Sequence, residues 1–412
     1  MDDTTIRLRQ PGADDLLAWT RPAAAAFGET FGAAELEHDR HQLELDRLIG
    51  AVEGDRWVGT GGAYSFRLTV PGGAEVGAAG ITYIGTAPSH RRRGVLRQIM
   101  GWLCDQAADR GEPVAILWAS ESAIYQRFGY GIATLQSSFD IERQRVRFVR
   151  PAEPIGRRRM VDRDEAVRLI PPIYEARRAQ IPGAVSRHDA KWRYGLLDDK
   201  EWMQQGNGPK FMAVLEVDGT PRGYVLYRVQ NAWDDRGPNN TVLALEVLGL
   251  DPAAERAIWE WLFDLDLAGH IKGWRGVVPH PLLLELTEPR RLGLIVRDGL
   301  LLRLLDMPAA LRARTYDTAG SLTFELSDAF RPANAGRWRL DAGDGGTATI
   351  DRSDGDPDLT LDTSDLASVY LGTFRFADLA GAGRVGECRP GAVAIADRLF
   401  ASTTPPWCST QF

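Results

Sequence analysis

Three consecutive arginines and a glycine follow an apolar stretch in the first quarter of the chain. Ile81–Ala87 is rich in β-branched and small residues, Pro88 follows it, and His90–Gly94 reads H-R-R-R-G. The apolar spacing after Gly94 is typical of an amphipathic helix. Backbone N–H groups and the positive end of the helix dipole converge at such a helix start, and both favour an anion. These residues predict a binding site for a phosphorylated ligand.

A second group of polar residues follows the next apolar run. Pro113–Trp118 reads P-V-A-I-L-W, which is typical of a strand buried on both faces. Ser120 and Glu121 come next, followed by the block I-Y-Q-R-F-G-Y-G at Ile124–Gly131. Ser120 and Glu121 also have the composition of a helix N-cap with a first-turn acid, and a capping role is compatible with ligand binding.

The elements that must position these residues occur in the order strand, helix, meander, strand, helix. The expected elements before and after Ile81–Ala87 are a strand at Thr5–Arg9, helices at Ala13–Phe27, Ala34–Leu48 and Gly94–Arg110, and a strand pair within Trp57–Val70. This order places the arginine loop at the end of one strand, directly before a helix.

A similar order of elements begins again near Arg158. The expected elements are a helix at Asp164–Gln180, a hairpin within Phe211–Val229, a strand at Leu243–Leu250 and a helix at Pro252–Leu267. The strand corresponds to Ile81–Ala87, but D-P-A-A-E-R replaces S-H-R-R-R-G after it. Because Asp251 and Glu255 would repel a diphosphate, we expect a duplicate that kept the fold and lost the ligand.

The pattern changes again from about Asp306. Short alternating segments are separated by D-G, G-D-G-G and S-D-G-D turns, which is typical of an antiparallel sheet. Helices are expected at Leu366–Gly372 and Val393–Ala401, and the chain ends in T-T-P-P-W-C-S-T-Q-F. A third domain is therefore predicted.

Composition limits the function classes. The 412 residues are 44% hydrophobic and 25% charged with a net charge of -7, which argues against general binding of nucleic acid or a membrane surface. Three cysteines without a C-x-x-C pair indicate neither a disulfide framework nor a zinc site. The first residues do not read as a signal peptide and no run could span a bilayer, so a cytoplasmic enzyme is expected.

The motifs resemble the Eis ("enhanced intracellular survival") family of the GNAT acetyltransferase superfamily. The resemblance rests on V/I-x-x-A-P-x-H-R-R-R-G-x-L at Ile84–Leu96 and on A-S-E-x-x-I-Y-x-R-F-G-Y-G at Ala119–Gly131, and it extends over the whole chain. It implies an α+β fold with two tandem GNAT-type mixed-sheet domains, the second degenerate, and a sterol-carrier-protein-like α/β domain. The implied domains are residues 1–152, 153–304 and 305–412, and the last one carries a functional C-terminus.

The resemblance implies acetyl-CoA as the acetyl donor and no metal ion. The pantetheine amides are expected to pair with Ile84, Gly85 and Thr86. The residues implied around the pyrophosphate are Arg91, Arg92, Arg93, Gly94, Val95, Leu96 and Arg97. Ser120 and Glu121 match further cofactor contacts of the family. A solvated basic surface is the alternative interpretation of the arginine run, but its place between a strand and a helix start favours the ligand site.

Two catalytic groups are implied by the resemblance. Acetyl transfer to an amine requires a neutral amine and protonation of the leaving sulfur. Tyr125 matches the general-acid tyrosine of the family, whereas Tyr130 is expected to pack the turn between two glycines. The implied base is the C-terminal carboxylate, here that of Phe412. The prolines and Trp407 before it are expected to let this tail dock.

The acceptor is less well defined by the sequence. Family members acetylate aminoglycosides and other polyamines, which implies a small-molecule amine substrate and a negative cleft lined by aromatic residues. Glu29 is the residue that we select as an amine contact, and solvated helix faces are the alternative for the acids around it. A lysine Nε-acetyltransferase of proteins or peptides, and a lipid or acyl-CoA binding protein without activity, remain alternatives. The family also implies a homohexamer.

Overall fold

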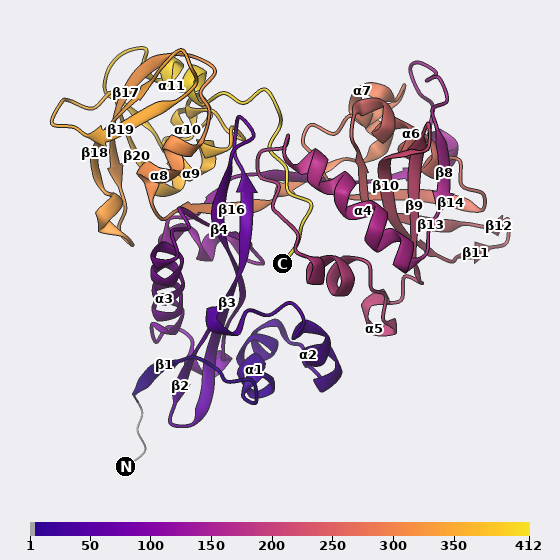
Figure 1. Ribbon diagram of the computed structural model, residues 1–412, viewed down its shortest axis with the longest axis horizontal. Helices are drawn as coiled ribbons and strands as arrows, with labels where there is room; N and C mark the ends of the chain where they lie inside the picture. The colour runs from indigo at the N-terminus through magenta and orange to yellow at the C-terminus, as the bar shows by residue number, and fades with distance from the viewer. Residues whose placement is uncertain (1–4) are drawn as a thin grey trace. The chain divides into compact units, whose positions relative to one another are not determined.

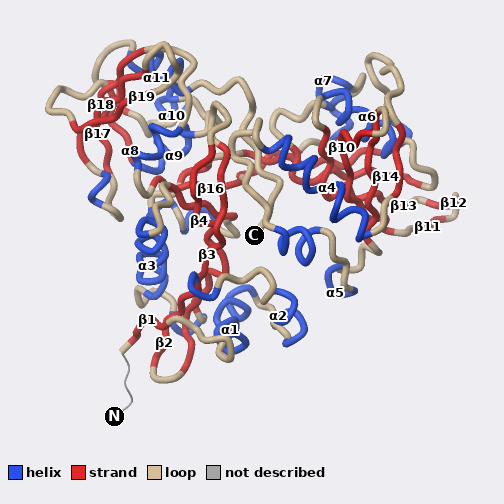
Figure 2. Tube along the Cα trace, viewed as in Figure 1, coloured by secondary structure: helices blue, strands red, loops and turns tan. Residues whose placement is uncertain are grey.

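The computed structural model describes residues 5–412, and the chain forms two compact units. The first unit comprises the chain up to Thr134, Gly299–Thr403 and Gln411–Phe412, and the second comprises Leu135–Asp298 and Thr404–Thr410. Residues 1–4 lie outside the described residues. They belong to the N-terminal segment that the sequence analysis does not identify as a signal peptide. Figure 1 shows the course of the chain and Figure 2 its helices and strands.

The first unit contains a seven-stranded mixed sheet. Its order is β1 (Ile6–Arg9), β2 (Leu48–Glu53), β3 (Arg56–Thr69), β4 (Glu75–Thr86), β5 (Val114–Trp118), β16 (Leu300–Leu304) and β6 (Gly131–Ile132). β4 and β5 are parallel, and the other neighbours pair antiparallel. The predicted strand at Thr5–Arg9 is confirmed by β1. The strand pair predicted within Trp57–Val70 is wrong, because this segment is one continuous strand, β3, whose antiparallel partner β4 begins at Glu75.

Three helices accompany this sheet, and glycines on β3 bring one of them close. The helices are α1 (Leu16–Phe27), α2 (Ala33–Asp39) and α3 (Val95–Asp109). A Cβ at Gly59 would lie 2.5 Å from Val95, and one at Gly61 would lie 2.5 Å from Ile99. The glycine-rich strand therefore admits α3 at short range, and the contact buries the apolar face of the helix. The helix predicted over Ala34–Leu48 is wrong beyond Asp39, because Leu48 begins a strand that pairs with β3.

A five-stranded sheet completes the first unit. Its order is β19 (Ala348–Arg352), β18 (Gly336–Ala342), β17 (Gly320–Ser327), β20 (Leu359–Asp362) and β21 (Gly386–Glu387). The helices are α8 (Met307–Ala313), α9 (Thr363–Tyr370), α10 (Phe376–Gly381) and α11 (Ala392–Phe400). Every residue of α9 is buried, and this helix packs against β16 and β6. The helices predicted in this region are confirmed by α9 and α11.

The second unit repeats the mixed sheet. Its order is β15 (Ile295–Asp298), β7 (Leu135–Glu142), β14 (Ala268–Gly276), β13 (Asn240–Gly249), β10 (Thr220–Gln230), β9 (Lys210–Val217) and β8 (Arg157–Met160). The helices are α4 (Arg163–Arg178), α5 (Glu201–Gln204), α6 (Pro252–Phe263) and α7 (Leu282–Glu285), and a small hairpin joins β11 (Trp233–Asp234) to β12 (Gly237–Pro238). The strand predicted at Leu243–Leu250 and the helix that comes after it are confirmed by β13 and α6.

Two strands lie in a different sheet from the one that chain order predicts. β7 precedes the expected boundary at residue 152 yet pairs with β14 and β15 in the second unit. β16 precedes the expected boundary at residue 304 yet pairs with β5 and β6 in the first unit. An alternating or continuous apolar pattern shows that a strand is buried but does not identify its partner, so chain order alone misplaced both. No helix within residues 5–412 combines the length and the hydropathy that a membrane span requires.

Candidate active site

The parallel strands β4 and β5 separate before β4 ends. Their pairing covers Ala78–Gly80, and β4 then continues to Thr86 in register with β3. Beyond Gly80 the described residues provide no β5 partner for β4, whereas the opposite edge of β5 pairs with β16 along its whole length. The β4 segment 81–86 therefore keeps an edge that is not used in the sheet. Such an edge can pair with an extended ligand that carries amides, as an added strand would.

A β-bulge interrupts β4 within this segment. Thr60 is opposite Gly85 and Gly62 is opposite Thr82, so Tyr83 and Ile84 together face one residue of β3. Tyr83 has a φ of 52°, a left-handed conformation that is rare for a bulky residue. Its carbonyl accepts from Thr60 Oγ1 at 2.7 Å, and its hydroxyl donates to Asp39 at 2.5 Å. These two bonds hold the bulge, which redirects Ile84–Thr86 as bulges beside functional sites do.

The glycine predicted to contact the cofactor is also required by packing. A Cβ at Gly85 would collide with the Cα of Ala23 in α1. Any larger residue would displace α1 from the sheet, since the contact is with backbone rather than with a flexible side chain. Gly85 thus keeps α1 packed on the face of the sheet over β3 and β4, whatever its backbone binds.

The arginine loop leads from β4 into α3 and contains two left-handed residues. Arg92 has a φ of 62° and Gly94, the N-cap of α3, a φ of 79°. Left-handed residues next to right-handed ones turn successive N–H groups toward one point, which is the geometry of an anion-binding nest. Gly94, Arg91, Arg92 and Arg93 are all exposed, and α3 starts at Val95. The loop thus presents backbone donors and cationic side chains at the N-terminus of a 15-residue helix.

The cationic side chains of this loop differ in their partners. Arg93 donates to Glu53 at 2.7 Å, and Nε2 of the buried His90 lies 3.0 Å from the same carboxylate. These partners lower the pKa of Glu53, with the His90 hydrogen bond as the larger cause. Arg97 lies over the Phe330 ring at 5.3 Å. Among the described residues no ion pair is recorded for Arg91 or Arg92. Arg93 and His90 therefore hold the loop on β2, while Arg91 and Arg92 can reach a ligand.

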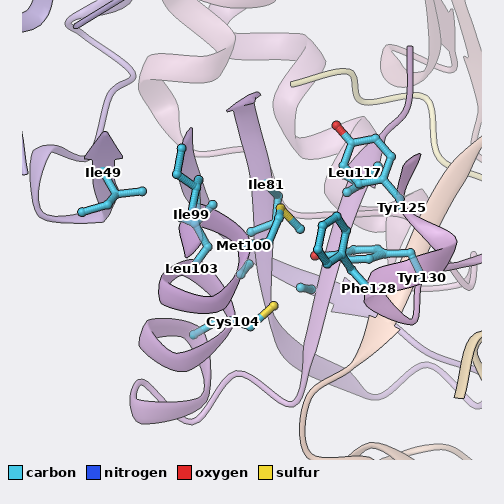
Figure 3. Packing of buried hydrophobic residues seen from close by; sticks show 14 of the residues in the cluster. Ile49, Ile81, Ile99, Met100, Leu103, Cys104, Leu117, Tyr125, Phe128 and Tyr130 are labelled. Atoms are coloured by element: carbon cyan, nitrogen blue, oxygen red, sulfur yellow. The ribbon is translucent and has the colours of Figure 1, made fainter. Parts of the chain in front are cut away.

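Tyr125 lies in the turn that comes after β5. Ser120 and Glu121 at the end of the strand are exposed, and Leu96 in the first turn of α3 is half-buried. The Tyr125 carbonyl accepts from the amide of Phe128 at 3.0 Å, which closes the turn. Tyr125 is 7% exposed, and Figure 3 shows its hydroxyl pointing away from the hydrophobic cluster. Burial, together with the charge of Glu121, raises the pKa of Tyr125 to about 12. Its phenol therefore carries a proton at neutral pH.

Tyr130 is inside the same cluster and has a different surrounding. It is 0% exposed, lies at a ring-centroid distance of 6.0 Å from Tyr125, and points into the cluster in Figure 3. Its hydroxyl has no hydrogen-bond partner of good geometry within the described residues. Burial raises the pKa of Tyr130 well above its usual value, and the neighbouring Cys104 adds to this. Tyr130 packs the turn, as the sequence predicts.

A buried arginine that the sequence analysis did not identify holds this turn. Arg303 of β16 donates to the Phe128 carbonyl and, at 2.7 Å, to Asp328, and both side chains are 0% exposed. A Cβ at Gly129 would collide with the Arg303 guanidinium, so only glycine fits there. The signal was present in the sequence as one arginine within L-L-L-R-L-L at Leu300–Leu305. A charge inside a buried strand requires a specific partner.

The last residue lies on the sheet of the first unit. The Phe412 ring is 4.8 Å from the Phe66 ring, and a Cβ at Gly80 would lie 3.1 Å from it. Gly80 is the last residue of β4 that pairs with β5. Phe412 is thus docked where the two strands separate.

The residues before it bind within the second unit. Trp407 donates its amide to the Pro182 carbonyl at 2.8 Å and its indole N–H to the Arg275 carbonyl at 2.7 Å. Thr410 accepts from Arg187 at 2.8 Å and lies 3.0 Å from the Tyr174 hydroxyl. The segment 404–410 is consequently ordered by hydrogen bonds, which confirms that the tail docks.

Glu29, the residue selected as an amine contact, is exposed and is not held by neighbouring side chains within the described residues. It is exposed directly after the Gly28 C-cap of α1, where its amide donates to Ala24 at 2.9 Å. No ion pair of Glu29 is recorded within the described residues. The same part of the chain contributes Asp39, which is bound to Tyr83. Across residues 5–412, no group of three or more His, Cys, Asp or Glu residues is arranged to hold a metal ion.

Comparison with known protein families matches all three parts of the chain. Residues 7–133 and residues 183–304 each match an acetyltransferase (GNAT) domain, and residues 307–409 match a sterol carrier protein domain. The chain thus has the α+β fold of two GNAT domains followed by a sterol-carrier-like domain. GNAT acetyltransferases use acetyl-CoA as the donor.

Full-length relatives give the same result. An uncharacterized N-acetyltransferase of Streptomyces avermitilis is 42% identical and covers 99% of this chain and 100% of its own length. The N-acetyltransferase Eis of Mycobacterium tuberculosis is 33% identical with the same coverage. The crystal structure of Eis1 from Mycobacterium abscessus superposes with a TM-score of 0.85 at 33% identity and covers 99% of this chain and 100% of that one. The chain is an N-acetyltransferase and belongs to the Eis family of the GNAT superfamily.

Proposed function

We propose that the first unit binds acetyl-CoA along the free edge of β4 and acetylates amines of cationic small molecules of the aminoglycoside or polyamine type. The observation that carries the proposal is the unpaired edge at 81–86, which runs directly into the loop Arg91–Gly94 at the start of α3. An extended pantetheine arm suits the first feature and a diphosphate suits the second. Bound acetyl-CoA supplies the acetyl group as an activated thioester.

Residues around this edge have distinct proposed roles. Ile84, Gly85 and Thr86 pair with the pantetheine amides through their backbone. The donors to the pyrophosphate are the amides of Arg92, Arg93, Gly94, Val95, Leu96 and Arg97 and the side chains of Arg91 and Arg92. Ser120 and Glu121, exposed at the end of β5, supply further contacts to the cofactor.

Tyr125 is the proposed general acid. A tyrosine phenol carries its proton at neutral pH. Burial raises the pKa of Tyr125 to about 12, and its hydroxyl points away from the hydrophobic cluster (Figure 3). The proton goes from Tyr125 Oη to the sulfur as the acetyl group leaves it. The same dry surroundings raise the basicity of a sulfur anion beside the phenol, which favours the transfer.

The carboxylate of Phe412 is the proposed base. The contact of its ring with Phe66 and Gly80 holds the chain end where β4 and β5 separate, beside the edge proposed for the cofactor. A carboxylate there accepts the proton that the ammonium group of the acceptor must lose before its nitrogen attacks the thioester. Glu29 is proposed as a contact for a cationic group of the acceptor.

A thiol-release assay tests this proposal on the full chain with an aminoglycoside, a polyamine and a lysine-containing peptide. We expect turnover with the first two, and a kcat for Tyr125→Phe lower by about 10²- to 10⁴-fold. Tyr130→Phe is the matched control, because the hydroxyl that it removes is buried in the cluster and has no hydrogen-bond partner of good geometry within the described residues. One residue added after Phe412 is expected to lower kcat with an unchanged Kd for acetyl-CoA.

The outcomes separate the alternatives. Faster turnover of the peptide than of either small amine would assign the chain to protein lysine acetylation instead. If no thiol is released and lipid is retained on the purified protein, the chain is a lipid or acyl-CoA binding protein without activity. Equal kcat for Tyr125→Phe and the wild type would remove Tyr125 from its role.

We further propose a cytoplasmic homohexamer, as the family resemblance implies. Exposed tryptophans in the second unit, Trp233 at 73% and Trp274 at 62%, are compatible with subunit contacts. Light scattering after size-exclusion chromatography gives the mass directly, and a monomer mass would exclude the hexamer.

A further inference from the structure

The second unit contains a cavity of about 220 Å³ where its own parallel strands separate. The pairing of β13 with β14 ends at Ala244 and Gly273. Leu245–Leu248 of β13 and Trp274–Gly276 of β14 then form walls of the cavity, and Pro405 and Trp407 add another. The cavity is the counterpart of the free β4 edge, but its surroundings are different.

An anion is disfavoured at the start of α6, beside this cavity. Asp251 caps the N-terminus of α6 by accepting from the Ala254 amide at 2.8 Å, and it pairs with Arg222 at 2.5 Å. The helix start is therefore already satisfied by a carboxylate of the chain. The left-handed glycine and the arginines of the first copy have no equivalent here. This end of the cavity does not suit a phosphate.

One carboxyl group of the lining lacks a partner. Glu246 is bound to Arg187 at 2.7 Å, and Glu285 lies 3.6 Å from Arg256. For the side chain of Glu255, in the first turn of α6, no hydrogen bond or ion pair is recorded within the described residues, although it lines the cavity. Burial raises the pKa of Glu255 to about 7, with Arg177 opposing this and Glu285 adding to it. A half-buried carboxylate without a partner is unfavourable unless a ligand supplies a cation or the group takes up a proton.

Another part of the cavity lining is aromatic. Trp259 lies one helical turn after Glu255 and is 6% exposed. His280 is packed at 5.7 Å from the Trp259 ring, and burial lowers the pKa of His280 to about 4. The imidazole is neutral at physiological pH and does not repel a cation. An apolar cavity of about 150 Å³ is large enough for benzene, so this one admits a single ring with a short substituent.

We propose that this cavity binds a small primary amine, whose ammonium group pairs with Glu255 and whose compact apolar body packs against Trp259. The ligand restores the ion pair that Glu255 lacks, and the aromatic wall excludes water from it. This site is separate from the proposed acetyl-transfer site and does not depend on it.

The probe for the test is 4-bromobenzylamine with the full chain in the absence of acetyl-CoA. Calorimetric titration at about pH 8 is expected to show binding that Glu255→Gln weakens by about 10- to 100-fold, the range for hydrogen bonds to charged groups. Glu201→Gln, at an exposed position of the second unit, is the matched control and is expected to leave the Kd unchanged. The alcohol analogue of the probe is expected to lose affinity to a similar extent.

The location is checked by the anomalous signal of bromine in a crystal soaked with the probe. A peak beside Trp259 that is absent in Glu255→Gln supports the site. A peak only in the first unit, or equal Kd values for the amine and its alcohol analogue, would overturn the proposal. Neither outcome affects thiol release or the kcat of Tyr125→Phe. The proposed amine site and the proposed acetyl-transfer site can therefore be disproved independently.

The affinity for the amine is also expected to rise between about pH 6 and 8 as Glu255 loses its proton, since an amine stays protonated there. The charged or titratable groups around Glu255 are Arg177 of α4, Glu246 of β13, Arg256 of α6, Arg275 of β14, His280 and Glu285 of α7. A flat affinity over this range would contradict the pairing with Glu255.

Discussion

The two mixed sheets share one feature, a parallel strand pair that separates early, and differ in the segment that follows the longer strand. In each, a parallel pair stops before the longer strand ends, at Gly80 in the first unit and at Ala244 in the second. In the first unit the chain then enters a loop with left-handed Arg92 and Gly94, whereas in the second it enters a helix capped by Asp251. The separation of strands is therefore a general property of the fold, and the helix N-terminus determines which charge can bind beside it.

The largest expected effect concerns two buried arginines, Arg303 in the first unit and Arg187 in the second. Arg303→Met leaves Asp328 buried without its partner, and Arg187→Met does the same to Glu246. Each change is expected to lower the free energy of unfolding by about 3–5 kcal/mol in urea denaturation. Arg331→Met, which removes a pair with the exposed Asp105, is the control and should cost at most about 1 kcal/mol. Equal effects for all three would mean that burial of the pair is unimportant.

The next effect is a pH dependence confined to the second unit. Burial raises the pKa of Glu255 from 4.5 to about 7. The unfolded chain releases this proton at lower pH, so stability falls as the pH rises from about 4.5 to 7, by up to about 3 kcal/mol. Denaturation at several pH values checks this. Glu255→Gln should flatten that part of the profile, and an unchanged slope would contradict the assignment.

A third prediction concerns a variant in which the N-cap of α3 is given a carboxylate like that of α6. Gly94→Asp places a carboxylate at the N-cap of α3, where a Cβ meets nothing within 4 Å. We expect the Kd for acetyl-CoA to rise about 100-fold, because the new charge takes the place of the diphosphate. Gly94→Ala carries the same backbone strain without the charge and serves as the control. Similar Kd values for the two variants would attribute the effect to strain alone.

The smallest effect is the reverse change in the second unit. Asp251→Ala removes the cap of α6 and is expected to cost about 1 kcal/mol of stability in urea denaturation. Asp251→Asn retains an acceptor and should be nearly neutral. No gain of acetyl-CoA binding by the second unit is expected from either variant, because that helix start has no arginine loop.

Local features of the site were predictable from the sequence. The loop, the start of α3 and the packing role of Tyr130 follow from neighbouring residues whose chemistry is self-contained. The positions of Ser120 and Glu121 after β5 follow in the same way.

Long-range features were not predictable. Arg303 and Asp328 hold a turn that lies far away in the chain, and Tyr83 is paired with Asp39 across a bulge. The exchange of β7 and β16 between sheets depends on which edge each strand meets. A single sequence shows which residues must be buried, but it does not show which buried groups are partners.

The position of β16 also has a consequence for the synthesis of the chain. This strand lies between β5 and β6, although it is made long after both of them. A nascent chain that ends before Leu300 exposes the unpaired edge of β5, which is a template for aggregation. The first sheet can close only after most of the second GNAT domain has left the ribosome. Deletion of the second GNAT domain from the gene would therefore also remove β16, which is an interior strand of the first sheet.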